Sequence, residues 1–488
     1  MSDEHTSGVN RRMMLTGIGA GALGLAGATT AQAVQLPEPA TSEEFDVVVI
    51  GSGVSGCCAA MEAASSGARV VLLEKASENR MGGNSFLAGG GFSLPLEDTA
   101  ASRDDYVEDY EKYCLGRGNA AIFRLMADNV VADLAWLEEN GVVLNPPSPW
   151  PPTRVQMTIV APGFFAGMPN FFRRMRTRLP ELGVTVRFDT KAKQLVIDDK
   201  GAVTGVRATG RDGVVEYRGK AVIIAAGGYG GNTAMLEAYS DPNAGAMMVR
   251  GIDWATGDGL VMAQQAGAGL KGMGGLMALH IAAVDGIETA AGQPATVVPH
   301  AISINSEGHR FVDESLGYVS HGKAVLTQPG QSTSLVFDQA IRDTVADSVM
   351  ATFARLGRPV HQADTLEELA SKVGAPVETF VKTVSDFNAA VADGAAPGAV
   401  PPKGTLANRI ETAPFYAFSP LVPGITLTFG GIMINESGQV LEPDGRVIPG
   451  LFAAGEGAGA PFFQDYIGGG SLTNCLVMGR IAGRNAVA

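Results

Sequence analysis

Short apolar runs alternate with glycine clusters along most of the chain. The β-branched run at residues 45–50 predicts a buried parallel strand, and Gly51-Ser52-Gly53-Val54-Ser55-Gly56 follows it directly. An alanine-rich stretch over residues 57–66 then predicts a helix, and residues 69–73 predict a second strand that ends in Glu74. This order of strand, glycine turn, helix, strand and acid is typical of a dinucleotide-binding unit.

The glycines and the terminal acid of this unit can each be explained by a contact that a bound dinucleotide or close packing requires. Gly51 permits a tight turn, Gly53 lets the backbone approach a pyrophosphate, and Gly56 lets the helix pack closely on the strand. The phosphates would lie at the positive N-terminus of the helix. Glu74 would accept hydrogen bonds from the adenosine ribose. These features leave both NAD and FAD open as the cofactor.

The first forty residues follow a different pattern. Arg11-Arg12 precedes a weakly apolar stretch of glycine and alanine, and Ala31-Gln32-Ala33 has the small-x-small form of a signal-peptidase site. The segment resembles a twin-arginine signal. We therefore predict a signal peptide at 1–33, a linker at 34–43, and export to the periplasm or cell envelope. The apolar run is too short and too rich in glycine to span a membrane well, so we expect no stable membrane span in the mature protein.

Charge and cysteine usage narrow the class of partner. The net charge is −14, which repels nucleic acid, and we expect no nucleic-acid partner. The four cysteines form no CxxC pair and no haem-attachment spacing, so we expect no metal site and interpret them as small buried hydrophobic residues: Cys57, Cys58, Cys114 and Cys475. Electrons would then leave to an external acceptor, a quinone or a redox protein.

Further glycine-rich segments follow the first unit, at residues 81–91, 221–228, 255–259 and 450–456. Together with that unit they resemble the flavoprotein family of fumarate reductases, succinate dehydrogenases and 3-ketosteroid dehydrogenases, from about Phe45 to the C-terminus. The resemblance implies FAD and an α/β fold. It implies a discontinuous Rossmann-like FAD-binding domain at 44–275 and 429–488, with an inserted α+β capping domain at 276–428.

The resemblance also implies which residues bind FAD. They lie in the glycine turn, at the end of the second strand and in the later glycine-rich segments: Gly51, Gly53, Ser55, Gly56, Glu74, Lys75, Gly82, Gly83, Asn84, Ser85, Gly89, Gly90, Ala226, Gly227, Asp258, Glu456, Gly470, Ser471 and Leu472. Succinate dehydrogenases carry the histidine of covalent flavin attachment at about the position of Asn84, so we expect non-covalent FAD. A helix after Gly470 would direct its N–H groups and positive end at the flavin O2 atom.

Three positions decide the expected substrate. The fumarate reductases of the family have carboxylate-binding arginine or histidine there, whereas this chain has Tyr318, Tyr466 and Leu427. A dicarboxylate would leave unpaired charge in such a pocket at a cost of several kcal/mol. We therefore expect an apolar ketone or enone substrate and a pocket that is apolar: Phe429, Phe463, Leu427 and Gly469.

The sequence Glu314-Ser315-x-x-Tyr318 resembles the 3-ketosteroid dehydrogenase branch of the family. This resemblance implies desaturation of a 3-ketosteroid or cyclic ketone at the α,β carbons, with hydride transfer to flavin N5. Tyr318 would be the base and Tyr466 its partner or the carbonyl donor, with the two roles open to exchange and Tyr416 a third candidate. Gly468 departs from the serine of that branch. Two alternatives stay open: an exported enone or enoate reductase that runs the reverse reaction, and a non-catalytic flavin electron carrier.

Overall fold

The computed structural model describes residues 36–211, 213–282 and 294–488. The predicted signal peptide, with Arg11-Arg12, lies outside the described residues, so export stays a prediction. The predicted linker is shorter than expected, because Thr41–Glu44 forms strand β1, which pairs in parallel with β10 (Gly213–Arg218). A polar strand suits this place at the edge of a sheet, where one side faces water.

A six-stranded sheet forms the centre of the larger lobe. Its order is β20-β21-β11-β2-β3-β7, and the last five run parallel to one another. The strands come from three distant parts of the chain: β2 (Val47–Ile50), β3 (Val70–Leu73), β7 (Thr185–Arg187), β11 (Ala221–Ile224), β20 (Gln439–Leu441) and β21 (Val447–Ala453). All of the residues of β2, β3 and β11 are apolar and buried, as expected of central parallel strands. The predicted Rossmann-like, discontinuous fold is confirmed.

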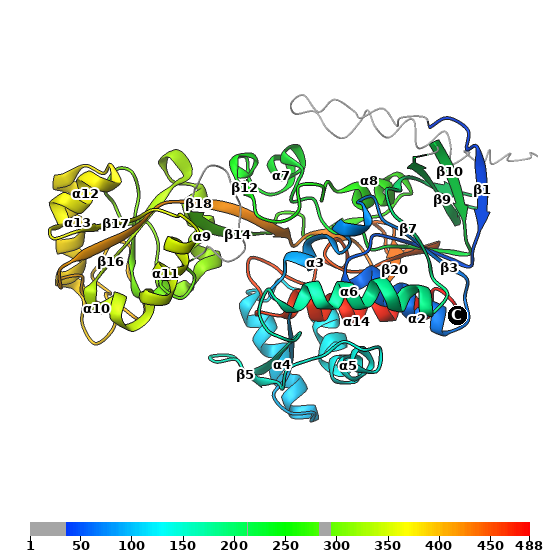
Figure 1. Ribbon diagram of the computed structural model, residues 1–488, viewed down its shortest axis with the longest axis horizontal. Helices are drawn as coiled ribbons and strands as arrows, with labels where there is room; N and C mark the ends of the chain where they lie inside the picture. Colours follow the sequence, from blue (N-terminus) through cyan, green and yellow to red (C-terminus); the bar gives the residue numbers. More distant parts are fainter. Residues whose placement is uncertain (1–35, 212, 283–293) are drawn as a thin grey trace, which may run out of the picture.

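Two helices pack side by side across this sheet, α2 (Val54–Ser65) and α14 (Gly470–Asn485), as Figure 1 shows in blue and red. Glycine makes the contact possible. A Cβ atom at Gly479 would lie 2.6 Å from the Ser55 carbonyl oxygen, and one at Gly483 would lie 2.4 Å from that of Ala59. The two backbones therefore touch, and this contact sets the position of the N-terminus of α14.

The other elements of the larger lobe surround this centre. The helices are α3 (Gly83–Leu87), α4 (Ala100–Tyr113), α5 (Ala120–Glu139), α6 (Gly167–Glu181), α7 (Thr233–Tyr239) and α8 (Asp258–Gln265). The remaining strands are β4 (Gly91–Pro95), β5 (Ser148–Pro149), β6 (Val155–Ile159), β8 (Lys191–Ile197), β9 (Val203–Gly210), β13 (Leu270–Lys271) and β19 (Gly431–Ile432). All four cysteines are buried and free, as interpreted from the sequence.

The smaller lobe is the capping domain, at the left of Figure 1. Its sheet includes β12 (Met248–Val249), β14 (Leu276–Ala282), β15 (Ile302–Ile304), β16 (Thr333–Asp338), β17 (Val360–Ala363) and β18 (Phe415–Thr428). Its helices are α9 (Tyr318–Leu326), α10 (Gln339–Ile341), α11 (Asp347–Arg355), α12 (Leu366–Val373) and α13 (Val377–Ala390). Strand β18 is long enough to run from the cap into the larger lobe, so residues at its end join the two parts.

A buried charge cluster lies inside the cap. Arg310 donates two hydrogen bonds to the Glu314 carboxylate, and Lys403 lies 3.7 Å from the same group. The three side chains are at most 1% exposed. Burial lowers the pKa of Lys403 to about 8, although Glu314 opposes the shift. The family motif around Glu314 thus holds the cap together, just before the chain enters α9.

Candidate active site

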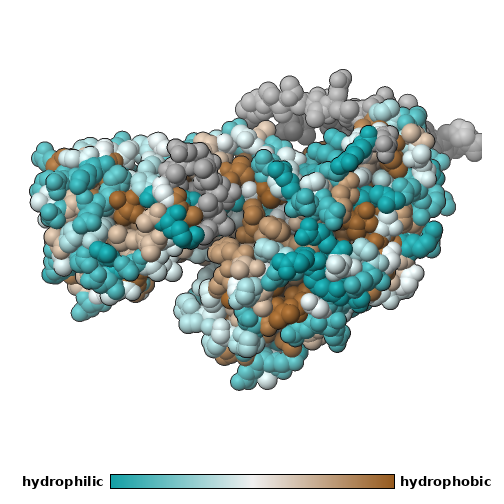
Figure 2. Space-filling model, viewed as in Figure 1, coloured by the Kyte–Doolittle hydropathy of each residue, from teal (hydrophilic) through white to brown (hydrophobic). Residues whose placement is uncertain are grey.

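A cavity of about 510 Å³ opens where the two lobes meet. Apolar side chains gather on the surface near this junction, as Figure 2 shows in brown. The wall includes the glycine turn, the end of β3, residues 82–91, the 225–227 loop, residues 250–258 and the start of α14. The cap and β18 supply the opposite wall. All of the residues predicted to bind FAD line this cavity except Gly56 and Gly470.

The glycine turn explains one of these two exceptions. Gly51 has a φ of +100°, and a Cβ there would lie 2.5 Å from the Ala225 carbonyl oxygen. A Cβ at Gly56 would lie 1.9 Å from the Gly51 carbonyl oxygen. Gly56 therefore packs the helix against the turn, which is the role that the sequence predicted for it, and faces away from the cavity.

Two helix N-termini meet the cavity. Gly53 is the N-cap residue of α2 and Gly469 is that of α14, and neither has a side chain that could cap the first turn. Part of each first turn is bonded elsewhere, since the Val54 N–H donates to Ser85 Oγ at 3.3 Å and the Gly470 N–H donates to Ile467 O at 3.0 Å. The other first-turn N–H groups and the positive end of the helix dipole suit an anionic oxygen. A Cβ at Gly470 would lie 2.3 Å from the Tyr110 hydroxyl, so Gly470 faces protein and not the cavity.

Two acids stand on the predicted dinucleotide wall. Glu74 follows β3 and accepts hydrogen bonds from the Ser52 N–H at 3.0 Å and the Ser52 hydroxyl at 2.6 Å. Asp258 lies 2.6 Å from Lys75 Nζ and 2.9 Å from Lys191 Nζ. Burial opposes ionisation of Asp258, but the two lysines outweigh it and lower its pKa. The two acids, Glu74 and Asp258, and the two lysines therefore balance one another in charge at this end of the cavity.

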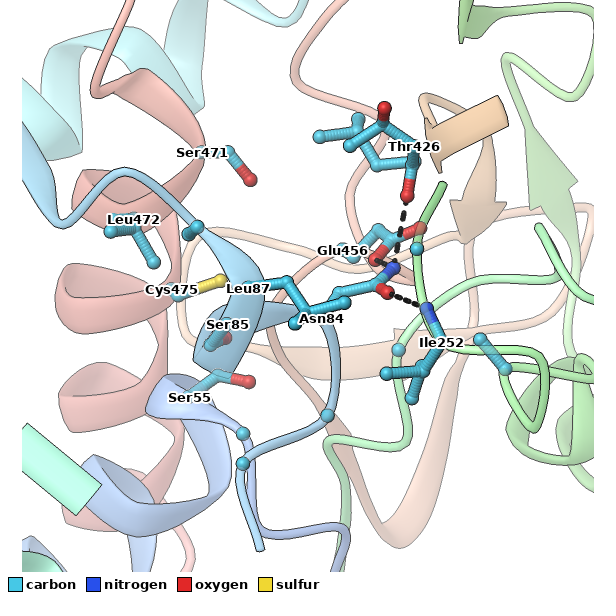
Figure 3. Close-up of a pocket in the computed structure, with 18 of the residues that line it drawn as sticks. Ser55, Asn84, Ser85, Leu87, Ile252, Thr426, Glu456, Ser471, Leu472 and Cys475 are labelled. Carbon is cyan, nitrogen blue, oxygen red and sulfur yellow. Dashed lines mark hydrogen bonds between the residues drawn. The ribbon is translucent and has the colours of Figure 1, made fainter. Parts of the chain in front are cut away.

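Asn84 connects three segments at the cavity wall, as the dashed lines in Figure 3 show. Its Oδ1 atom accepts from the Ile252 N–H at 2.8 Å, and its Nδ2 atom donates to Thr426 O and to Glu456 Oε2, both at 3.1 Å. Burial raises the pKa of Glu456, while hydrogen bonds from Thr428 and Asn84 oppose that shift. Asn84 is thus a structural junction between these segments.

Tyr318 and Tyr466 line the same cavity from different elements. Tyr318 is the first residue of α9, and Tyr466 lies in the loop before α14, with its ring packed on Phe462 at 5.5 Å and on Phe429 at 6.0 Å. Burial raises the pKa of Tyr318 to about 12; Asp465 adds to the shift and Arg250 opposes it. Burial raises the pKa of Tyr466 more strongly, and the nearby Tyr318 adds to it. The structure therefore brings together the two tyrosines that the sequence paired.

Other predicted residues lie elsewhere. Tyr416 is fully buried within the cap, where its hydroxyl accepts from Arg342 at 2.8 Å and donates to Gln339 Oε1 at 2.7 Å. That hydroxyl is engaged outside the cavity, so Tyr416 does not join the tyrosine pair. Of the four predicted pocket residues, Leu427 and Gly469 line the cavity. Phe429 and Phe463 are absent from that wall: the Phe429 ring packs against the Tyr466 ring, and the Arg117 guanidinium lies over the Phe463 ring at 3.8 Å.

Sequence reasoning missed Arg250, which lines the cavity and is 6% exposed. Its backbone N–H donates to Ile425 O at 2.8 Å, and its Nη1 atom donates to Thr426 Oγ1 at 3.1 Å. It belongs to no motif, and its partners on β18 lie about 175 residues further along the chain. It also missed a set of large apolar side chains on the wall: Trp150, Met157, Phe164, Phe165, Met277 and Leu279.

Comparison with known proteins agrees with this geometry. The family model described as an FAD binding domain matches residues 46–471. A probable fumarate reductase, Ifc3, of Shewanella frigidimarina is 31% identical over 462 residues, which span 91% of this chain and 75% of that protein.

Two solved structures share the fold. The open conformation of a flavocytochrome c3 fumarate reductase matches with a TM-score of 0.76 and 28% identity, over 100% of this chain and 82% of that one. A 3-ketosteroid Δ4-(5α)-dehydrogenase from Rhodococcus jostii RHA1, in complex with 4-androstene-3,17-dione, matches with a TM-score of 0.72 and 25% identity, over 94% of this chain and 99% of that one. The chain therefore belongs to the FAD-binding flavoprotein family of the fumarate reductases and succinate dehydrogenases.

Proposed function

We propose that this FAD-dependent oxidoreductase of CH–CH bonds works as a reductase, which adds hydrogen across a carbon–carbon double bond conjugated to a carbonyl group. The state of Tyr318 carries the proposal. Tyr318 lines the cavity, and burial raises its pKa to about 12. Such a phenol is protonated near neutral pH, so it is suited to donate a proton. A role as the base of a dehydrogenation, the first expectation from the sequence, would need a lowered pKa.

The residues of the other wall fit FAD. The N-termini of α2 and α14, each with a glycine as its N-cap residue, suit a pyrophosphate and a flavin carbonyl, and the turn at Gly51 leaves no space for a side chain. FAD, when bound, supplies hydride exchange at its N5 atom. The first-turn N–H groups of α14 would stabilise negative charge that reduction leaves on the flavin ring.

A side chain of the protein then supplies the proton. Tyr318 would transfer the proton of its hydroxyl to the α carbon of the substrate, while the β carbon would take the hydride that bound FAD would supply. The double bond would become a single bond with two new C–H bonds, and a proton from solvent would restore the Tyr318 hydroxyl. Tyr466, with the more strongly raised pKa, stays protonated and donates a hydrogen bond to the substrate carbonyl oxygen. The two electrons come from an external donor, a quinol or a redox protein.

We also propose that FAD is held non-covalently, because Asn84 stands at the position of the attachment histidine. Acid precipitation of the purified protein should release yellow flavin into the supernatant. Flavin that remains in the precipitate would contradict this.

A second candidate is the reverse reaction, desaturation of a ketone. The solved 3-ketosteroid dehydrogenase supports it, with 25% identity across nearly the full length of both chains. The motif Glu314-Ser315-x-x-Tyr318 supports it as well. In that direction Tyr318 would accept the proton, and its pKa would have to fall when substrate and cofactor are bound.

Stopped-flow spectroscopy of the flavin separates the candidates. Under anaerobic conditions, protein with pre-reduced flavin should be re-oxidised rapidly by an enone or an α,β-unsaturated acid. Protein with oxidised flavin should bleach slowly or not at all with the matching saturated compound. Rapid bleaching by saturated ketones, with no re-oxidation by any unsaturated partner, would establish the dehydrogenase instead. No response in either direction would leave a non-catalytic flavin carrier.

A further inference from the structure

A short loop at residues 459–468 carries Tyr466 to the cavity, between β21 and α14. Two of its residues with side chains have a left-handed backbone, since φ is +42° at Ala460 and +63° at Gln464. Such a conformation costs energy in a residue with a Cβ atom, so it persists where the surroundings hold the backbone in place. The position of Tyr466 at the cavity therefore depends on the contacts of this loop.

The larger lobe holds one side of the loop. Asn119, the N-cap residue of α5, donates from its Nδ2 atom to Gly459 O at 3.0 Å and from its backbone N–H to Pro461 O at 2.9 Å. The Cys114 thiol donates to Asp465 O at 3.4 Å. All three bonds come from the connection between α4 and α5. They fix the loop within its own lobe and do not connect it to the cap.

The cap holds the other side of the loop through Lys323 on α9. The Lys323 Nζ atom donates to the Gln464 carbonyl oxygen and, at 2.8 Å, to Gln464 Oε1. It also lies 5.8 Å from the centre of the Phe429 ring, which packs against the Tyr466 ring. Lys323 follows Tyr318 by five residues on the same helix. One side chain thus joins the helix that begins with Tyr318 to the loop that carries Tyr466.

Charge strengthens the contact between Lys323 and the loop. Burial lowers the pKa of Lys323 to about 8, and the nearby Asp465 and Cys114 oppose that shift. Burial raises the pKa of Asp465, while the Tyr466 N–H and Lys323 oppose it. That N–H donates to Asp465 Oδ1 at 2.7 Å. The ammonium and the carboxylate therefore stabilise each other next to the backbone of Tyr466.

Lys323 itself does not line the cavity, so it can act on the reaction through the groups that it holds. We propose that Lys323 is a positioning residue for the proposed reaction: it holds the Gln464 backbone against α9 and so keeps Tyr466 in place near Tyr318. This inference rests on the proposed function, in which Tyr466 donates a hydrogen bond to the substrate carbonyl oxygen. Because the lysine belongs to the cap and the loop to the larger lobe, the two tyrosines act together while the lobes are joined at this contact.

The test is a double-mutant cycle with Tyr466. Lys323→Met keeps the length and the apolar stem of the side chain but removes the ammonium, and Lys323→Arg keeps the charge and the donors. Each is made in the wild type and in Tyr466→Phe. Lys382→Met is the matched control, because that lysine is an exposed residue of the cap that pairs with Asp386 on α13. The probe is 2-cyclohexenone, added without oxygen to protein with reduced flavin and compared at equal flavin content.

We expect Lys323→Met to lose about 10-fold in kcat/KM, since a misplacement of about 1 Å in an active site can cost about 100-fold. In the Tyr466→Phe background the same change should cost less than about 2-fold, because the group that it misplaces is already gone. Lys323→Arg should recover most of the rate, and Lys382→Met should behave as the wild type. An equal loss in both backgrounds, or Lys323→Arg no better than Lys323→Met, would overturn the inference.

A binding measurement separates this inference from the proposed function. Cyclohexanone, the saturated ketone, should perturb the absorbance of oxidised flavin and bind about 5-fold more weakly to Lys323→Met, the value of about one hydrogen bond. In Tyr466→Phe, Lys323→Met should change its binding little. If the ketone binds in this way but 2-cyclohexenone does not re-oxidise the flavin, the positioning role stands and the reductase function fails. If Lys323→Met binds the ketone as the wild type does, the positioning role fails whatever the activity.

If neither probe acts on the wild-type protein, the loop itself supplies the readout. Chymotrypsin cleaves after phenylalanine, and Phe463 precedes Gln464 in the loop. In the flavin-bound protein, cleavage after Phe463, identified by mass spectrometry, should be faster in Lys323→Met than in the wild type or Lys382→Met. Equal cleavage in the three proteins would show that Lys323 does not hold the loop, and would overturn the inference.

Discussion

Replacement of Tyr318 by phenylalanine is the sharpest perturbation of the proposed chemistry, because it removes a single oxygen atom and keeps the ring. Tyr318 is the first residue of α9 and lines the cavity, and its side chain packs at the edge of the core. The variant should therefore fold and retain FAD. What it loses is the proton donor to the substrate α carbon.

The expected loss of rate follows from the role of Tyr318 as the proton donor. General acid catalysis by a positioned side chain contributes about 100- to 10,000-fold to a rate. We expect the re-oxidation of reduced flavin by an enoate to slow by that factor in Tyr318→Phe. Tyr466→Phe should slow the reaction less, because it removes a hydrogen bond to the carbonyl oxygen and not the proton itself.

The pH dependence gives an independent test. The pKa of Tyr318 is raised to about 12, so the donor stays protonated throughout the range in which the protein can be studied. The wild-type rate of the chemical step should be flat between about pH 6 and 10, where an ordinary tyrosine with a pKa near 10 would already lose activity. An inflection below pH 10 assigned to Tyr318 would refute the reasoning.

A matched control is available inside the chain. Tyr416 is a buried tyrosine whose hydroxyl bonds to Arg342 and Gln339 within the cap. Tyr416→Phe should cost about 1 kcal/mol of stability and leave the rate of flavin re-oxidation unchanged. The assignment fails if Tyr318→Phe keeps the wild-type rate, or if Tyr416→Phe slows the reaction as much as Tyr318→Phe does.

Three more predictions follow from close contacts and buried charge. Gly56→Ala would place a methyl group 1.9 Å from Gly51 O and should abolish FAD binding, as measured by the ratio of flavin to protein absorbance; a yellow variant would contradict it. Gly470→Ala would place a methyl group 2.3 Å from the Tyr110 hydroxyl, and such overpacking should cost about 1–3 kcal/mol, seen as a lower thermal midpoint of the holoprotein. Glu314→Gln leaves two buried cations in the cap uncompensated and should cost about 3–5 kcal/mol in urea unfolding; an unchanged urea midpoint would show that the cluster is not charged as described.

The sequence predicted the structure best where an element depends on residues that are close together in the chain. The unit from residue 45 to Glu74 depends on neighbouring residues, so a β-branched run, spaced glycines and a terminal acid were enough to predict strand, turn and helix. The start of α14 was predictable for the same reason. A glycine turn followed by an apolar run marks a helix N-terminus without any knowledge of what it faces.

Long-range contacts could not be predicted in this way. Asn84 was predicted to lie beside the flavin and lines the cavity, but the sequence did not show that its amide joins segments that lie 168, 342 and 372 residues away. Arg250 had no motif around it, and only the path of β18 brings Thr426 to it. Tyr416 matched a family segment, yet the register of β18 with β16 turns it into the cap core. In each case, pairing between distant strands decides where the side chain points.

The side chains that line the cavity predict which substrates turn over faster. The expectation of a neutral substrate came from Tyr318, Tyr466 and Leu427, and all three residues line the cavity. A carboxylate that lies against these three side chains would be an unpaired charge, at a cost of several kcal/mol. A neutral enone should therefore have a higher kcat/KM than the dicarboxylate fumarate when each is added to protein with reduced flavin. Faster turnover of fumarate would show that a cation reaches the substrate.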